Sequence, residues 1–232
     1  MTLLDSYRTQ WPRVGAVVGM ALAGAVALVS RTMSKPQTLA ALNAAALSVH
    51  QYEEYEDPGY FPGQFNRGVL KSREPDRYPL NTHIGMCVNT AFAYPFYALP
   101  VLFPKTKWVG IAPALFGMMQ AVGHGVIFPR LAGARYSPGF LASIFLHVPL
   151  GIRYFQSIGP TARSDWAKGI AYTVAFAAVG VAGPNVLMRD HNSPYRFTRR
   201  QVGPYAIETP EGRHSRRPDS ARTTPARSVE VR

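Results

Sequence analysis

The chain has 232 residues, of which 47% are hydrophobic and 16% charged, and it contains one cysteine. The single Cys87 excludes an intramolecular disulfide and a zinc site built from cysteines. The formal net charge of +12 is typical of nucleic-acid-binding proteins, but ten of the 25 Lys and Arg residues lie in 189–232, so we do not expect a nucleic-acid partner.

Long stretches without charge alternate with basic connections, which predicts an all-α, polytopic transmembrane bundle. A span needs roughly 20 mostly apolar residues. Trp108, Tyr136 and Trp166 lie at segment boundaries, where interfacial aromatic residues are enriched. The predicted transmembrane domain covers residues 1–188 and has about six spans, near 14–30, 36–54, 83–103, 107–129, 137–156 and 166–188.

The first segment also fits a signal peptide, because Arg8 and Arg13 precede its short apolar run. At the other end, residues 189–232 are rich in Pro, Ser, Thr and Arg and lack an apolar run. We therefore expect a disordered basic tail there, whose protein partners the sequence does not indicate. The arginines of this tail give the side of the membrane that holds both termini an excess of positive charge. Because basic residues are enriched on the cytoplasmic side, we expect both termini to be cytoplasmic, and the plasma membrane is the simplest location.

The densest group of chemically active residues ends the second predicted span. His50, Glu53 and Glu54 share one helix face, since residues three and four apart are neighbours. Two adjacent carboxylates repel each other unless a cation offsets the repulsion. This pattern predicts a metal site, in which Glu53 and Glu54 are also the candidate catalytic residues.

The predicted topology brings further polar residues to the same half of the membrane. His124 ends the fourth span, and His147, a weaker metal-ligand candidate, lies in the fifth. Ionisable residues within a membrane are functional candidates by default. The other polar residues expected to line the site are Asn89, Gln120 and Tyr136.

Structural explanations compete with each of these assignments. Glu53 and Glu54 could pair with basic residues of the next loop, and His124 or His147 could simply bond a neighbouring helix. His83 and His191 fit surface positions. The basic loop residues concerned are Arg67, Lys71 and Arg73. The sequence contains no Gly-rich phosphate loop, HExxH or GxSxG, nor the His boxes of membrane desaturases.

The stretch from His50 to Tyr55, with Pro58-Gly59, Phe61 and Asn66, resembles the HXXEE-motif family of membrane proteins, whose function is unsettled. Further matches are Asn89, His124 and the Tyr136-Ser137-Pro138-Gly139 turn. The resemblance covers roughly residues 38 to 157. It implies a membrane domain built around the His/Glu motif and metal dependence, but no particular reaction.

Three functions are compatible with these features. The first is a metal-dependent membrane oxidoreductase or hydrolase acting on a lipid or other apolar substrate, with His50, Glu53, Glu54 and His124 as ligands of iron, manganese or zinc. The second is a transporter in which the carboxylates and His124 bind protons or cations. The third is a membrane scaffold whose tail recruits partners.

Overall fold

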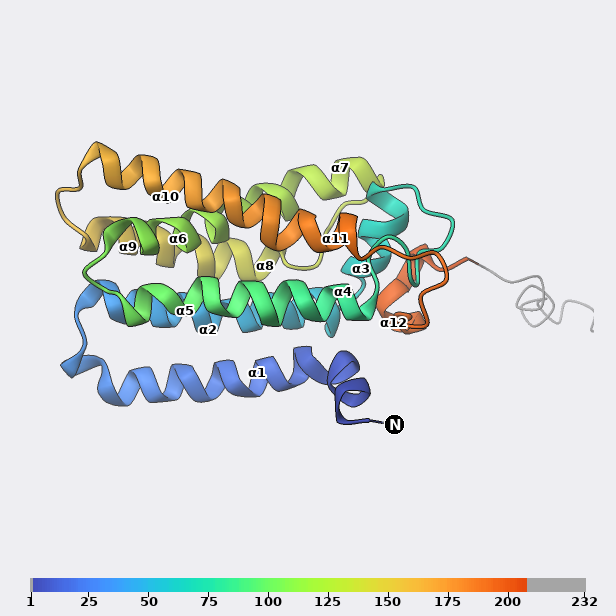
Figure 1. Cartoon of the computed structure of the whole chain (residues 1–232), viewed down its shortest axis with the longest axis horizontal. Coiled ribbons are helices and arrows are strands. Elements are labelled where there is room, and N and C mark those ends of the chain that lie inside the picture. The colour runs from blue at the N-terminus through green and yellow to red at the C-terminus, as the bar shows by residue number, and fades with distance from the viewer. Residues whose placement is uncertain (1, 208–232) are drawn as a thin grey trace, which may run out of the picture.

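The helices join into six long rods that lie side by side along the long axis of the molecule (Figure 1). This arrangement comes from a computed structural model that describes residues 2–207, and within that range the chain has no β-strand. The all-α prediction is therefore confirmed for these residues. The first and last described residues lie at the same end of the bundle (Figure 1).

Two of the rods are single helices, and four are interrupted by a wider π-helical turn. The single ones are α1 (Leu3–Val29, extended by η1, Ser30–Thr32) and α2 (Lys35–Tyr55). The interrupted ones are α4 (Thr82–Met86), η3 (Cys87–Ala93) and α5 (Tyr94–Leu102); α6 (Lys107–Val122), η4 (Gly123–Ile127) and α7 (Phe128–Ala132); α8 (Phe140–Ala142), η5 (Ser143–His147) and α9 (Val148–Ser157); and α10 (Arg163–Ala175), η6 (Phe176–Ala182) and α11 (Gly183–Leu187). Short segments cover one end of the bundle: α3 (Phe61–Gly63), η2 (Gln64–Val69), α12 (Arg199–Val202) and η7 (Gly203–Tyr205).

Each interruption has a cause in the sequence, because a proline follows each of the four π-helical turns within the rods by two residues. Proline has no N–H group, and its ring clashes with the carbonyl of the residue four positions earlier. That earlier residue lies inside the π-helical turn in all four rods, so the helix widens where it would otherwise clash. The prolines are Pro95, Pro129, Pro149 and Pro184.

Four helical stretches are long and apolar enough to cross a membrane. They are Leu3–Thr32, Thr82–Leu102, Lys107–Ala132 and Arg163–Leu187. The rods formed by α2 and by α8 to α9 are not among them, so six spans remain a prediction. In α2 the hydropathy is lowered by polar residues that face the interior, including His50, Gln51 and Glu54.

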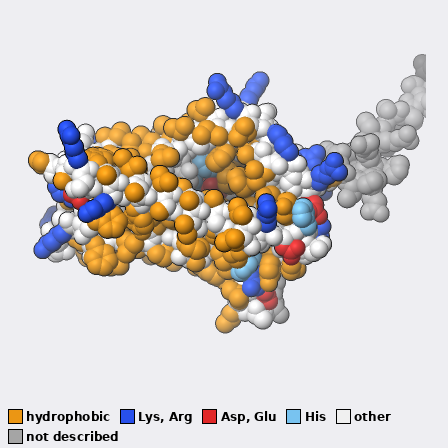
Figure 2. All heavy atoms as spheres, turned by 45° about the horizontal axis from the view of Figure 1, so that its top comes forward, with side chains coloured by type: hydrophobic (Ala, Val, Ile, Leu, Met, Phe, Trp, Pro, Cys, Tyr) orange, Lys and Arg blue, Asp and Glu red, His pale blue; other side chains and the backbone are white. Residues whose placement is uncertain are grey.

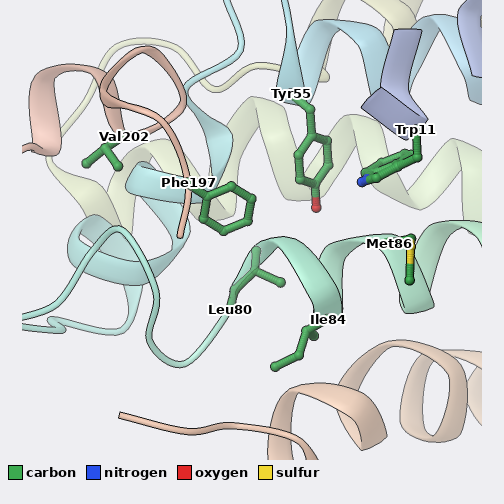
Figure 3. Packing of buried hydrophobic residues seen from close by; sticks show 7 residues of the cluster. All are labelled: Trp11, Tyr55, Leu80, Ile84, Met86, Phe197 and Val202. Carbon is green, nitrogen blue, oxygen red and sulfur yellow. The ribbon is translucent and has the colours of Figure 1, made fainter. Parts of the chain in front are cut away.

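The expected tail is folded as far as residue 207, which corrects the prediction of disorder from residue 189. Phe197 and Val202 are buried in a cluster with Tyr55 and Trp11 at the end of the bundle (Figure 3). The Tyr55 ring lies 4.8 Å from that of Trp11 and 6.2 Å from that of Phe197, measured between centroids. Phe197 and Val202 are isolated apolar residues in a polar sequence, so they form no periodic pattern that would predict a helix or strand. Their burial nevertheless stabilises the segment. Residues 208–232 lie outside the described part of the chain.

Candidate metal centre

Three buried side chains meet inside the bundle, near the end that carries α3 and α12. His50 and Glu54 lie one turn apart on α2, and His124 comes from η4. The Oε1 atom of Glu54 lies 3.5 Å from Nε2 of His50 and 3.3 Å from Nε2 of His124. One ligand atom from each residue lies within 4.8 Å of the other two, and all three residues are less than 9% exposed. This group could hold a metal ion.

The hydrogen bonds of His50 determine which of its ring nitrogens carries a proton. The Ser143 hydroxyl donates its only proton to the Gly139 carbonyl at 2.6 Å, so it can only accept from Nδ1 of His50, 3.2 Å away. A neutral His50 therefore directs the lone pair of Nε2 toward Glu54. That nitrogen is buried and has no hydrogen-bond partner among the described residues. A lone pair facing a carboxylate oxygen needs a cation or a proton between them.

His124 is oriented in the same manner, by a serine on the opposite side of its ring from Glu54. Its Nδ1 lies 3.1 Å from the hydroxyl of Ser137, and its Nε2 faces Glu54. Metal-binding histidines commonly bond through the second ring nitrogen in this way, which fixes the ring orientation. His50 and His124 thus present the same nitrogen to the same carboxylate.

A glycine closes the site from the side of the loop between α7 and α8. Gly139 has a φ of +101°, which side chains other than glycine rarely adopt. A Cβ atom there would lie 2.8 Å from Cε1 of His124 and 3.0 Å from Cε1 of His50. The Tyr-Ser-Pro-Gly turn of the sequence therefore supplies both the hydrogen bond to His124 and the space for the two rings.

Glu53, a predicted ligand, has a different environment from Glu54. Its Oε1 accepts hydrogen bonds from the Tyr136 hydroxyl and from the N–H of Leu141 at 3.1 Å, and its Oε2 accepts from the N–H of Ala142 at 2.7 Å. The carboxylate thus satisfies free N–H groups at the start of α8. Burial and the hydrogen bond to Glu53 raise the pKa of Tyr136, which keeps the phenol protonated as a donor.

His147 lies beside this centre but outside the group of three ligand atoms. Its ring centroid is 5.5 Å from that of His50. Its Nδ1 is 2.7 Å from Oδ1 of Asn43, whose Nδ2 donates to the Pro113 carbonyl at 3.4 Å. Since the Asn43 oxygen accepts, Nδ1 of His147 carries the proton and Nε2 is a buried lone pair without a partner among residues 2–207.

A cavity of about 230 Å³ adjoins the three candidate ligands, which form part of its wall. Most of the remaining wall is apolar, and the predicted residues Asn89 and Gln120 contribute two of its amides. Figure 2 shows a hollow on one face of the molecule, where histidine and carboxylate side chains are visible among hydrophobic ones. The apolar wall includes Leu47, Val88, Phe116, Phe176 and Val181.

The other histidines lie apart from this centre. Nδ1 of His83 accepts from Arg8 at 3.3 Å, and His191 contacts Glu74 at the surface at 2.6 Å. His214 lies outside the described residues. Lys71, a possible partner of the acidic pair, instead donates to the carbonyls of Gly68 and Leu131. The sequence interpretation missed Ser143 and the roles of Ser137 and Gly139. For Ser137 and Gly139, the Tyr-Ser-Pro-Gly turn was the only local signal.

Comparison with known families agrees with the resemblance seen in the sequence. Residues 41–154 match the family described as "Protein of unknown function with HXXEE motif". This segment contains His50, Glu54, His124 and the serines that bond the two imidazoles. Searches among curated proteins and among solved structures gave no match.

Proposed function

We propose that this chain, a member of the HXXEE-motif family, binds one divalent transition-metal ion through His50, Glu54 and His124. The observation that carries the proposal is the pair of imidazole nitrogens directed at one carboxylate oxygen in a buried site. Ligand atoms at about 2.0–2.2 Å from a shared ion lie roughly 3–3.5 Å apart. The distances of 3.3 and 3.5 Å from the two imidazole nitrogens to Glu54 fit that spacing.

Two imidazoles and one carboxylate suit iron, manganese or zinc. The same donor set, with open positions beside it, is typical of non-haem iron centres that use dioxygen. Here all three candidate ligands line one cavity, so an ion held by them would border a space that a substrate can fill. Bound iron would supply the redox chemistry, while the protein holds the ion and the substrate together.

The mostly apolar cavity favours a lipid or another apolar molecule as substrate. It is lined by residues of α6, η4, η6 and α11, among others, which lie on the face seen in Figure 2. Because four of the helical stretches are long and apolar enough to span a membrane, we place the protein in a bilayer, with substrate entering from the lipid. Leu47, Phe116 and Phe176 would then contact the apolar part of the substrate.

Between the two reactions considered, the geometry favours oxidation over hydrolysis. Hydrolysis at a metal-bound water needs a free carboxylate or another base nearby. Glu53 is the second carboxylate of the motif, but both of its oxygens are occupied by the start of α8. Asn89, Gln120 and Asn185, also in the cavity wall, carry amides that do not act as bases at neutral pH. His147 has a free imidazole nitrogen, but it does not line the cavity.

Elemental analysis of detergent-purified protein tests the metal site. The protein is loaded in turn with Fe(II), Mn(II) or Zn(II), desalted and analysed beside the Glu54→Gln and His191→Ala variants. We expect about one ion per chain in the wild type and in His191→Ala, whose imidazole lies at the surface, and a substoichiometric amount in Glu54→Gln. If no ion is retained by the wild type, the proposal is wrong, and a transporter or scaffold becomes the better explanation.

Dioxygen consumption tests the reaction separately. Fe(II)-loaded protein receives a membrane lipid extract and a chemical reductant, with the Zn(II)-loaded form as control. Lipid-dependent consumption by the iron form alone is expected. Release of water-soluble head groups or fatty acids without dioxygen uptake would instead indicate hydrolysis.

A further inference from the structure

A second, larger groove lies on another face of α2, away from the candidate metal ligands. Its floor is formed by Leu42, Ala45, Ala46 and Val49 of α2, and α1 and the η5–α9 rod form its two sides. The groove has a volume of about 550 Å³. The wall is apolar except for one charged side chain, that of Arg153 on α9.

The helices approach closely on one side of the groove and leave it open elsewhere. A Cβ atom on Gly19 would lie 2.5 Å from Cβ of Ser48, so α1 and α2 are in tight contact there. Met20 on α1 and Phe145 on η5 are 67% and 71% exposed at the rim. In a bilayer these exposed apolar side chains face lipid, and an acyl chain fits the groove between them.

Arg153 lies in the middle of α9 (Val148–Ser157), and α9 lies at the end of the bundle opposite α12 (Figure 1). It is exposed and forms no ion pair or hydrogen bond with any other residue in 2–207. The three connections at this end and the first two turns of the helices that follow them hold six basic residues against one acidic residue, Asp165. The basic residues are Arg31, Lys35, Lys105, Lys107, Arg163 and Lys168.

We propose that the groove binds an anionic phospholipid, with an acyl chain between α1, α2 and α9 and the phosphate on Arg153. A guanidinium binds phosphate with two parallel hydrogen bonds, and the long side chain reaches the interface while its stem contacts apolar surface. The Arg153 guanidinium favours a head group with net negative charge over a zwitterionic one, because it repels the cationic group of the latter. The surrounding basic residues attract anionic lipid to this end of the bundle but do not select what enters the groove. This inference does not depend on metal binding, because none of the candidate ligands lines the groove.

Native mass spectrometry of the full-length protein in detergent tests the site. The protein is incubated with phosphatidylglycerol or with phosphatidylcholine carrying the same acyl chains. We expect the one-lipid complex to be about fivefold more abundant with phosphatidylglycerol. Arg153→Gln should reduce that preference to about one, while Arg163→Gln, which removes a charge outside the groove at the same end, should leave it unchanged.

A second variant tests the groove itself without changing charge. Ala23→Phe places a ring between α1 and α2, and it should reduce binding of both lipids in a protein that remains monodisperse. Equal binding of the two lipids by the wild type would overturn the proposal. So would an Arg163→Gln variant that loses the preference as completely as Arg153→Gln, because the selectivity would then come from diffuse charge.

Discussion

At the scale of single residues, the two adjacent glutamates of the motif perform different tasks. Glu54 faces two imidazole nitrogens, whereas Glu53 accepts N–H groups at the start of α8. Adjacent residues on a helix point about 100° apart, which sends one carboxylate to the site and the other to the neighbouring rod. The sequence shows the pair but not this division, since Leu141 and Ala142 are 88 and 89 residues from Glu53 along the chain.

This division predicts opposite results for two matched substitutions. Glu54→Gln should remove stoichiometric metal, because a neutral amide replaces the anionic ligand, and it should change the melting temperature little. Glu53→Gln should keep the metal but lose about 1–2 kcal/mol of stability, as expected for loss of a helix cap. Metal analysis and thermal unfolding of both variants check this. Loss of metal in Glu53→Gln at an unchanged melting temperature would contradict the assignment.

The serine behind His50 gives a second residue-level prediction. Ser143→Ala removes the acceptor for Nδ1 of His50, so the ring can change tautomer and turn Nε2 away from Glu54. Metal affinity should fall about 10- to 100-fold, which is usual when a hydrogen bond to a metal-binding histidine is lost. Competition titration with a chelating dye measures the change. Ser157→Ala is the control, because that hydroxyl also bonds a helix carbonyl but lies on the far part of α9.

At the scale of elements, the π-helical turns that interrupt the rods carry several of the side chains in and around the candidate metal centre. His124 lies in η4, Ser143 and His147 lie in η5, and Asn89 lies in η3. A wider turn changes the direction in which the following side chains point, and such turns are frequent at functional sites. The prolines that cause them are visible in the sequence. Their effect on side-chain direction depends on the three-dimensional structure.

Pro129→Ala tests the importance of η4. Without the ring, the carbonyl of Gly125 can accept a normal helical hydrogen bond, so the turn should tighten and move His124 relative to α2. We expect metal affinity to fall by about tenfold or more, while helix content stays the same or rises. Chelator competition and circular dichroism measure the two quantities. Pro184→Ala, which tightens a turn without a candidate ligand, should leave affinity unchanged, and equal losses in both variants would indicate general destabilisation.

The sequence was sufficient to predict that His50, Glu54 and His124 lie close together, because helix geometry and chain direction determine their positions. His50 and Glu54 are one helical turn apart, so any helix places them together, and the alternating direction of the rods brings His124 to the same end. The grouping of these three residues was therefore predictable, although metal binding itself remains our proposal. The hydrogen bonds of Ser143 and Asn43 depend on how the rods pack, and nothing in the local sequence distinguishes these residues from other polar ones. Ser137 is marked only by its place in the Tyr-Ser-Pro-Gly turn.

At the scale of the whole molecule, the bundle has two distinct ends. Four rods contribute to the wall of the metal centre and its cavity near one end, which α3 and α12 cover. The other end carries the basic connections and Arg153. If the rods cross a bilayer as we propose, the proposed metal site lies closer to one face and the lipid groove closer to the other.

The end of the bundle that α3 and α12 cover gives the last prediction, because residues 189–207 pack there against α2. Truncation after Ile207 should leave the melting temperature and metal content unchanged. Truncation after Met188 removes Phe197 and Val202 from Tyr55 and exposes its ring. Each buried apolar side chain is worth roughly 1.5–3 kcal/mol, so the melting temperature should fall by several degrees. Differential scanning fluorimetry of the two truncated proteins in detergent measures this. If both melt like the full chain, the contacts of residues 189–207 add no stability, and the end of α2 is held by the bundle alone.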